Sequence, residues 1–277
     1  MKKSCKITVL VENTASGRGL LGEHGLSYFI EADGRRLLFD TGQGLTLLHN
    51  ARQLGVSLEN LDAIALSHGH YDHTGGLMAV LDLCQPTDLF LHPEALKLKY
   101  SPRGEIGCPV KEEETLKTRV RRLVWTEKPT EIFPGISLTG VIPRTNLLED
   151  TGGLFWQTPT GTQADLLLDD QALFLETPAG VVVVLGCAHA GVVNTLDYIA
   201  ELTGQKKFHA VIGGMHLLRA DVERLRATVE ALEKYEVKVL GANHCTGMAA
   251  MAFLWQNFAG ECVSCSVGTR LNFSVAE

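Results

Sequence analysis

Short apolar runs recur along the chain and predict a protein rich in β-strands. Each run is dominated by Val, Ile and Leu and has the length and composition of a strand that is buried on at least one face. Asp33-Gly34, between the second and third runs, is a strong signal for a two-residue hairpin turn. The predicted strands cover residues 7–11, 26–32, 36–40, 63–67, 88–92, 136–140, 171–176, 181–186, 210–214 and 237–242.

Helices are expected between some of these strands. Apolar residues recur every three or four positions from 222 to 232, after Asp221 as a predicted N-cap, and the same spacing runs from 192 to 202 and stops at Gly204. Strands gathered in hairpin-rich clusters with helices between them predict an α/β (α+β) fold, in which mixed sheets are covered by helices on their outer faces.

Residues 100–165 break this pattern, because they are richer in Pro, Gly, Lys, Arg and Glu. The charge clusters at 111–114 and 119–122 are expected to form a solvated face. Long segments of this kind often act as lids or binding loops, so we expect a substrate-cap insertion at 100–165 within a single domain of residues 1–277.

Composition narrows the class of protein. With 277 residues and 45% hydrophobic residues the chain can bury a proper core, and a net charge of −7 argues against a general binder of nucleic acid or of membrane surfaces. No stretch approaches the roughly 20 apolar residues of a membrane helix. Seven scattered cysteines, and a start that runs into a strand rather than a signal-peptide core, predict a reducing cytoplasm.

The most concentrated chemistry lies directly after the predicted strand 63–67. His68, His70, Asp72 and His73 fall within one short loop, and an extended chain would send His68 and His70 to the same side. Solvated loop histidines are the plainer interpretation. Such close packing of three histidines and an aspartate beside a buried strand favours a metal site instead.

Three further histidines share one context, since His189, His216 and His244 each lie just after an apolar strand and beside glycine. A single strand-end histidine is more often an ordinary hydrogen-bonded residue, but three alike favour convergence at one sheet edge. Asp40 follows a buried strand and could orient a metal-bound histidine or cap a turn. His24 could line the site, although loop exposure is the default. Less weight falls on His49, His92 and His209.

The run His68-x-His70-x-Asp72-His73, preceded by residues 39–42 and followed by the strand-end histidines, resembles the metallo-β-lactamase superfamily of binuclear metallohydrolases. The resemblance covers most of the chain. It implies a four-layer αββα sandwich of two mixed β-sheets flanked by helices, with the metal site along one edge of the two sheets.

Within that superfamily, residues 67–76, 186–191, 213–216 and 244–247 are similar to a subgroup of metal-dependent hydrolases. Some of its members carry the name 7,8-dihydropterin-6-yl-methyl-4-(β-D-ribofuranosyl)aminobenzene 5'-phosphate synthase, which describes a pterin-joining step in methanopterin biosynthesis.

The resemblance also implies roles for individual residues. His68 and His70 match ligands of a first metal, and Asp72 and His73 match ligands of a second. His244 matches the last strand-end ligand. Asp40 matches the aspartate that lies behind a ligating histidine.

The middle of the chain departs from the superfamily pattern, in which a strand often ends in a Gly-Asp pair whose aspartate bridges two metals. Here the corresponding strand ends in Gly186-Cys187, with His189 two residues later, while Asp169-Asp170 stand earlier. We assign His189 as the remaining ligand of the first metal, with Cys187 or an aspartate as an alternative. His216 is either an extra ligand or a proton donor.

These residues predict a hydrolase that uses a metal-bound hydroxide on an ester, lactone or phosphodiester of a small molecule. Asp72 would orient the hydroxide and His216 would protonate the departing oxygen. Zinc, as one or two ions, fits His and Asp ligands best, and Mn²⁺ or Fe²⁺ is compatible. Arg103 and Arg144 could bind a phosphate, although a surface role is the default for each.

Two other functions remain open. One is a pterin-type synthase that uses the same metal site to make a bond. The other is a non-hydrolytic ligand-sensing or redox module, which ranks last because redox iron variants carry glutamate where this chain has His70. A small-molecule substrate is the partner implied, and the sequence leaves its binding residues and the oligomeric state open.

Overall fold

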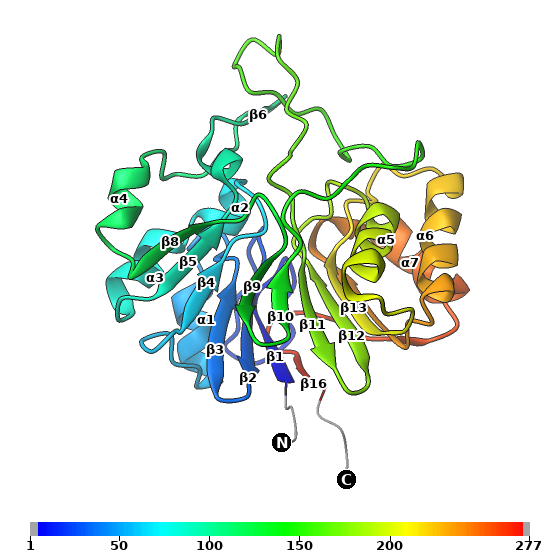
Figure 1. Cartoon of the computed structure of the whole chain (residues 1–277), viewed down its shortest axis with the longest axis horizontal. Coiled ribbons are helices and arrows are strands. Elements are labelled where there is room, and N and C mark those ends of the chain that lie inside the picture. Colours follow the sequence, from blue (N-terminus) through cyan, green and yellow to red (C-terminus); the bar gives the residue numbers. More distant parts are fainter. Residues whose placement is uncertain (1–4, 274–277) are drawn as a thin grey trace.

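The computed structural model of the chain describes residues 5–273 and contains two seven-stranded β-sheets packed face to face between helices (Figure 1). The predicted fold, two mixed sheets flanked by helices, is confirmed.

The first sheet has the strand order β16-β1-β2-β3-β4-β5-β8. Its strands β16, β1, β2 and β3 pair antiparallel, and β3, β4, β5 and β8 pair parallel. The bounds are β1 (Cys5–Val11), β2 (Ser27–Ala32), β3 (Arg35–Phe39), β4 (Ala63–Ala65), β5 (Asp88–Leu91), β8 (Arg122–Trp125) and β16 (Arg270–Asn272).

The second sheet has the same layout, in the order β15-β14-β13-β12-β11-β10-β9. Its strands β9 to β12 pair antiparallel, and β12 to β15 pair parallel. The bounds are β9 (Thr130–Phe133), β10 (Ile136–Leu138), β11 (Leu173–Thr177), β12 (Gly180–Leu185), β13 (Phe208–Gly214), β14 (Val239–Asn243) and β15 (Glu261–Cys262).

Helices cover the outer face of each sheet, as Figure 1 shows. Apolar residues of α1 and α3 pack on the first sheet, and those of α5, α6 and α7 pack on the second. The helical bounds are α1 (Leu47–Leu54), α2 (Tyr71–Thr74), α3 (Leu77–Leu83), α4 (Glu113–Lys117), α5 (Val192–Thr203), α6 (Val222–Lys234) and α7 (Met248–Asn257), with short 3₁₀ turns η1 (Pro93–Leu96) and η2 (His244–Thr246).

The strand β12 is covered by apolar residues on both of its faces. Val181, Val183 and Leu185 pack against the outer helices, while Val182 and Val184 face the core between the sheets. A strand covered on both faces reads as a continuous apolar run rather than an alternating one. Each such side chain contributes roughly 1.5–3 kcal/mol when fully buried.

Turn and cap residues act as the sequence predicts. Asp33 and Gly34 both have positive φ, 49° and 80°, which the tight β2–β3 turn requires. The Asp221 side chain accepts a hydrogen bond from the Arg224 backbone N–H at 2.9 Å, and Gly204 ends α5 in the left-handed conformation.

Every predicted strand is present, with ends that differ by a few residues, but four strands of the two seven-stranded sheets were not predicted: β8, β9, β15 and β16. These are short, and β8, β9, β15 and β16 are also the strands at the outer margins of the two sheets. A margin strand has one neighbour and tolerates charge, so its apolar signal is weak.

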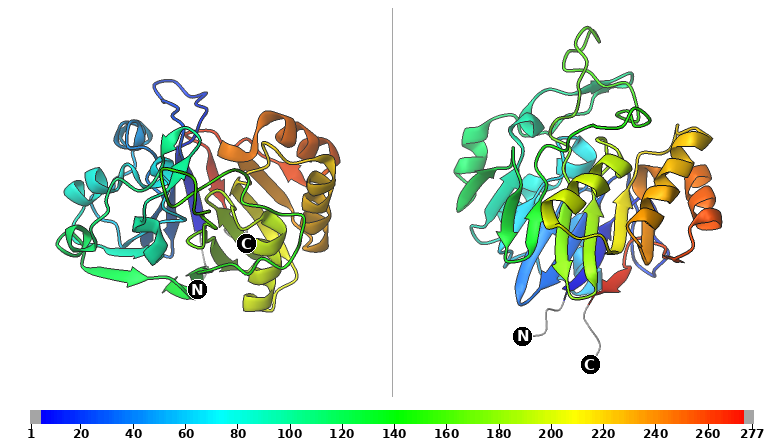
Figure 2. Two further views of the ribbon diagram at one scale, coloured as in Figure 1. Left: turned by 90° about the horizontal axis from the view of Figure 1, so that it is seen from above. Right: turned by 45° about the vertical axis from the view of Figure 1, so that its right-hand side comes forward.

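Residues 100–165 divide between the sheets and the loops above them. The strands β8, β9 and β10 lie in the sheets, whereas β6 (Tyr100–Ser101) and β7 (Gly104–Glu105) form a separate small hairpin. Figure 1 and the right-hand view of Figure 2 show the green loops of this stretch standing above the ends of the sheets. Their role in covering a substrate stays a prediction.

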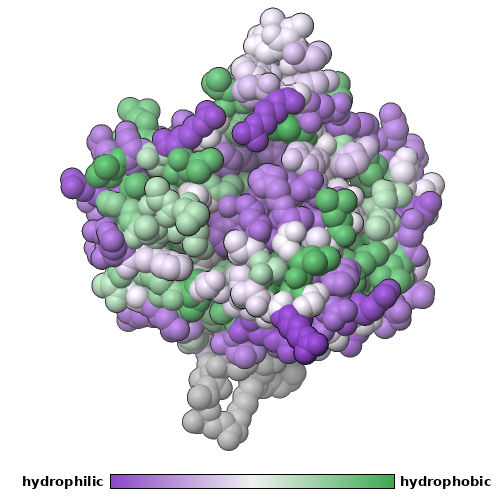
Figure 3. Space-filling model, turned by 180° about the vertical axis from the view of Figure 1, so that it is seen from behind, coloured by the Kyte–Doolittle hydropathy of each residue, from purple (hydrophilic) through white to green (hydrophobic). Residues whose placement is uncertain are grey.

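The surface is mixed in character. On the face drawn in Figure 3, hydrophilic residues cross the middle of the molecule between separate apolar patches. Within residues 5–273, every helix is too short or too polar to cross a bilayer.

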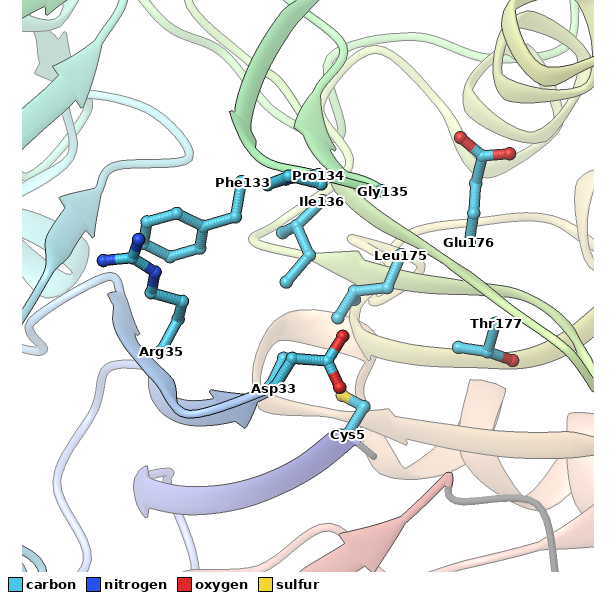
Figure 4. Close-up of a pocket in the computed structure, with 11 residues that line it drawn as sticks. Cys5, Asp33, Arg35, Phe133, Pro134, Gly135, Ile136, Leu175, Glu176 and Thr177 are labelled. Carbon is cyan, nitrogen blue, oxygen red and sulfur yellow. The ribbon is translucent and has the colours of Figure 1, made fainter. Parts of the chain in front are cut away.

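A cavity of about 220 Å³ lies where the β2–β3 and β9–β10 turns meet (Figure 4). The Arg35 guanidinium stands 5.6 Å from the centre of the Phe133 ring at its side. Because β3 and β10 begin here, this is the end of the sandwich opposite to the carboxyl ends of the parallel strands. It is therefore remote from the loops that carry the histidines.

Asp88, at the start of β5, pairs with two arginines of the charge cluster at 119–122. Its carboxylate accepts hydrogen bonds from Arg121 Nε at 2.7 Å and from Arg122 Nε at 3.0 Å. Burial alone would raise the pKa of Asp88, but the two arginines outweigh burial and lower it to about 2.

Replacing Asp88 by asparagine is expected to reduce the free energy of unfolding by about 1 kcal/mol at pH 7, since both arginines are well exposed to solvent. A carboxyl with a lowered pKa stabilises the fold above its ordinary pKa and loses that effect as the pH falls toward 2. Urea unfolding should therefore show the difference from wild type shrinking between pH 4 and pH 2. The control Asp82→Asn, in an exposed pair with Arg119, should change little at any pH. A pH-independent difference for Asp88→Asn would contradict this account.

Candidate metal centre

The loop after β4 brings four of the predicted site residues to one edge of the sandwich. His70 is extended, with φ −73° and ψ 145°, and immediately precedes α2, so Asp72 and His73 lie in the first turn of that helix. A Cβ at Gly69 would lie 2.2 Å from the Ala95 carbonyl oxygen. Glycine at 69 thus lets the loop pass directly against η1.

Asp40 lies behind this loop and holds it in place. Its Oδ1 accepts the Ser67 N–H at 2.7 Å, and its Oδ2 accepts the Ser67 hydroxyl and the His73 Nδ1–H, each at 2.7 Å. Burial alone would lower the pKa of His73, but the carboxylates of Asp40 and Asp72 outweigh it and raise that pKa. The structure thus places Asp40 where it orients a histidine.

Four histidines are held through Nδ1, which leaves Nε2 free to face the centre. Asp40 accepts from His73, the Thr151 carbonyl accepts from His189 at 2.7 Å, and Asn13 Oδ1 lies 2.9 Å from His244 Nδ1. The Ser67 hydroxyl gives its proton to Asp40, so its oxygen can accept from His68 Nδ1 at 2.9 Å. Fixing the Nδ1 proton on an acceptor leaves the Nε2 lone pair available to a cation.

Two of the three groups of ligand atoms found in residues 5–273 share Cys187. Those of His68, Cys187 and His189 lie within 4.8 Å of one another, and so do those of His73, Cys187 and His244. His73 Nε2 is 3.2 Å from both His244 Nε2 and Cys187 Sγ. Such crowding of ligand atoms is the geometry expected of a metal site.

His70 lies beside the first group. Its Nδ1 is 3.0 Å from His68 Nε2, and its ring centre is 5.2 Å from that of Phe155. The Nε2 atoms of His70 and His189 are buried without a hydrogen-bond partner. A buried polar atom without a partner is costly, and a bound cation would relieve that cost for His189. The residues present therefore fit a metal centre.

The electrostatics also favour cation binding. Burial lowers the pKa of His68 and of His189 well below the ordinary value, and it lowers that of His70 to about 3. These imidazoles are neutral at pH 7, as metal ligation requires. Asp72 adds negative charge, because contacts with His73, His24 and His244 outweigh burial and keep its pKa well below the usual range.

Asp72 belongs to a third group of ligand atoms, with His24 and His244. Its Oδ2 lies 3.2 Å from His24 Nε2 and 3.4 Å from His244 Nε2. The His24 side chain is 55% exposed, as expected for a loop residue, and it also lies at the site through its contact with Asp72.

His216 lies next to the centre but belongs to none of the ligand groups found in residues 5–273. Its ring centre is 4.4 Å from that of His189, and its φ of 45° is in the left-handed region. Burial, with His244 and Arg224 nearby, lowers its pKa to about 4. Its predicted role as proton donor or extra ligand stays a prediction.

The two aspartates that were considered, with Cys187, as alternatives to His189 belong to none of the ligand groups in residues 5–273, and Asp170 Oδ1 is buried without a partner. Asp170 Oδ2 accepts the Ala190 N–H at 2.7 Å. Asp169 accepts the Gly69 N–H at 2.7 Å and pairs with Lys99 Nζ at 2.8 Å. Lys99, whose side chain is 1% exposed, also pairs with Asp165 at 3.0 Å. Lys99, Asp165 and Asp169, called the buried Lys99 cluster below, thus join the loops of 100–165 to the loop of residues 68–73.

Two cavities meet at the centre, and both are lined by His24, His216, His244 and Cys245. The smaller, of about 280 Å³, is bounded on the side of residues 100–165 by Arg103, Ile106 and Phe155. The larger, of about 460 Å³, includes Leu218, Met248 and Met251. Arg144 faces neither cavity and instead donates to the carbonyls of His189 and Leu166, each at 2.7 Å.

Several residues of the site carry no sequence signal of their own. Glu12 and Asn13 hold His244 through its backbone N–H and its Nδ1, across more than 230 residues of chain. Lys99 resembles any other lysine of a charged stretch. His24 could have been found from its glycine-containing loop, but nothing in the sequence pairs it with Asp72.

Comparison with known proteins gives a consistent family. A model of the metallo-beta-lactamase superfamily matches residues 21–239. The 7,8-dihydropterin-6-methyl-4-(beta-D-ribofuranosyl)-aminobenzene-5'-phosphate synthase of Methanocaldococcus jannaschii is 31% identical over 97% of this chain and 96% of its own. A ribonuclease Z of Methanopyrus kandleri is 40% identical over 73 residues, 26% of this chain and 24% of its own.

Among solved structures, the chain is similar to Tm1679, described as a metal-dependent hydrolase of the beta-lactamase superfamily. The identity is 33% with a TM-score of 0.84, over 98% of this chain and 100% of the other.

Proposed function

Because this chain belongs to the metallo-beta-lactamase superfamily, we propose that it is a metal-dependent hydrolase of a small substrate, acting on a phosphodiester or on an ester that carries phosphate. The observation that carries the proposal is the pair of ligand groups sharing Cys187, set beside a cavity that Arg103 also lines. Two zinc ions are the proposed cofactor, since imidazole, thiol and carboxylate ligands suit zinc.

Divalent ions bound there would supply Lewis-acid polarisation of the scissile bond and would acidify a water molecule toward a pKa of about 7. The Asp72 carboxylate, which is 10% exposed and lines the smaller cavity, would orient that water. Arg103 would bind the phosphate, because its planar guanidinium can make paired hydrogen bonds to phosphate oxygens.

His216 would move the proton from the water to the leaving oxygen. With a pKa lowered to about 4, its imidazole is neutral at pH 7, so it can first accept a proton and then pass it on. The Phe155 ring centre lies 5.2 Å from those of both His70 and His189 and covers them on the cavity side. This cover would keep bulk water away from the reacting bond.

A second candidate is a synthase that joins two substrates at the same centre. Two observations favour it. The similarity to the Methanocaldococcus jannaschii synthase extends over 97% of this chain, and two cavities meet at the ligand groups, as two reactants would need.

A reducing, cytoplasmic location is part of the proposal. All seven cysteines are free thiols, although Cys187 and Cys245 lie close enough for a hydrogen bond between their side chains. Exposed or neighbouring thiols stay reduced in that compartment.

The substrate class is tested with zinc-loaded protein and a panel of phosphodiesters, lactones and thioesters. We expect turnover of a phosphodiester, its loss on removal of metal by a chelator, and its return on addition of Zn²⁺. Arg103→Ala should raise KM for the phosphodiester roughly 10-fold, as expected for loss of a hydrogen bond to a charged group. KM for an uncharged lactone serves as the control.

The opposite result would be no turnover of any panel member, together with product formation from a pterin donor and a phosphoribosyl acceptor. That result would overturn the proposal of a hydrolase and favour the synthase.

A further inference from the structure

We propose that the Cys187 thiolate bridges the two metal ions, so that the centre is held together by sulfur. This inference deepens the proposed function and rests on it, because it requires that the protein bind two ions. It assigns Cys187 a role shared by no other residue of the centre.

The position of Cys187 between the two ligand groups is the first support. It alone belongs to both the His68–His189 group and the His73–His244 group among the described residues. Its Sγ lies 3.2 Å from His73 Nε2, and the residue is 3% exposed. An atom within 4.8 Å of the ligand atoms of both groups can contact an ion in each.

The chain brings Cys187 there by close contact between the two halves of the sandwich. A Cβ at Gly186 would lie 2.1 Å from the Ser67 hydroxyl oxygen, so only glycine permits this approach. Ala188, on the other side, has a φ of 53°, in the left-handed region. Backbone strain of this kind persists where the surrounding structure fixes it, and here it turns Cys187 and His189 toward the same centre.

A second, independent observation comes from His189. The residue is fully buried, its Nδ1 is used by the Thr151 carbonyl, and its Nε2 has no partner. This imidazole belongs to the same ligand group as Cys187. The unpartnered nitrogen and the thiol are therefore placed to bind one cation together.

The neighbouring aspartates Asp169 and Asp170 belong to no ligand group found in residues 5–273. Asp169 is bound by Lys99 and Gly69. Asp170 Oδ2 is bound by Ala190, and its Oδ1 is buried without a partner. Asp72 lies on the outer side, within the His24–His244 group. Cys245, the neighbouring thiol, is directed at the Cys187 carbonyl at 3.8 Å and belongs to no ligand group in residues 5–273.

Sulfur at this place has a chemical consequence. Thiolate is a soft ligand that favours Zn²⁺ and other soft or borderline cations over Mn²⁺ and Mg²⁺. A sulfur-bridged centre should therefore discriminate against hard cations more strongly than one built from imidazole and carboxylate alone.

The test uses the full-length protein loaded with Co²⁺, whose visible bands report ligation and whose near-ultraviolet charge-transfer band reports bound thiolate. We expect two Co²⁺ per chain and a thiolate band in the wild type. Cys187→Ser should lose the band, whereas the matched control Cys245→Ser should keep it. Cys187→Asp should bind two ions without the band.

Bridging is separated from terminal ligation by cadmium-113 NMR of the wild type loaded with Cd²⁺. A shared sulfur should shift both cadmium signals downfield, and a terminal one should shift a single signal. Two bound ions without a thiolate band, or a single shifted signal, would overturn the bridge and leave the proposed hydrolase standing. Failure to bind Co²⁺ or Cd²⁺ at all would overturn the proposed function itself. Because the decisive NMR spectra come from the wild type, poor folding of a variant leaves the test intact.

Discussion

Replacing His189 by alanine is expected to remove at least one metal ion per chain and to lower kcat/KM for the hydrolysed substrate by more than about 100-fold. Changes to groups that merely orient a ligand already cost about 10- to 100-fold in metal affinity or activity, so loss of a ligand should cost more. His189 is fully buried, and its unpartnered Nε2 belongs to the group with His68 and Cys187. Elemental analysis of the purified protein and steady-state kinetics measure the two effects.

Two other histidines make this result specific. His49, exposed and bonded to the Gly19 carbonyl, is the control, and His49→Ala should keep both metal and activity. His216→Ala should keep the metal and lose turnover if His216 moves a proton, whereas loss of an ion would make it a ligand. Full metal content in His189→Ala would show that the assignment of His189 as a ligand is wrong.

The second large effect concerns the buried Lys99 cluster. Replacing Lys99 by methionine is expected to lower the free energy of unfolding by about 3–5 kcal/mol, because it leaves buried carboxylates without their counter-charge. Asp165 and Asp169 are 4% and 0% exposed in their side chains, so water cannot replace the ammonium group. Urea unfolding followed by tryptophan fluorescence measures the change.

Lys97 provides the matched control two residues away. Its side chain is 57% exposed and pairs with Glu94, so Lys97→Met should change stability by less than about 1 kcal/mol. Lys99→Met should also weaken Zn²⁺ binding, since Asp169 supports the Gly69 N–H between His68 and His70. Wild-type stability in Lys99→Met would contradict the role given to this cluster.

The sequence predicts the layers of this fold well because most of its strands are apolar runs with a local signal. The strand β8 shows where this approach fails. The arginines of 119–122 are exposed, as predicted, but the sequence does not show that a strand begins at Arg122 or that Arg121 and Arg122 pair with Asp88 on the neighbouring strand. That pairing depends on tertiary contact, and no local pattern carries it.

Part of the candidate site can also be predicted from the sequence. The loop from His68 to His73 can be recognised because its side chains are neighbours in sequence, and the glycines at strand ends indicate His189 and His244. The partners that aim these histidines are distant in sequence, such as Asn13 for His244 and Thr151 for His189. Cys187 is an alternative ligand by spacing, and it belongs to two ligand groups, whereas Asp169 and Asp170 belong to none of those found in residues 5–273.

The wide separation of the ligands along the chain bears on the order of events during synthesis. His73 leaves the ribosome 114 residues before Cys187 and 171 residues before His244, yet these three side chains form one ligand group. A nascent chain that ends before β12 therefore carries the histidine loop without the residues that complete either group. Capture of a cation by the first group should therefore follow translation of His189, and capture by the second should follow translation of η2, so that neither cation guides the folding of the first sheet.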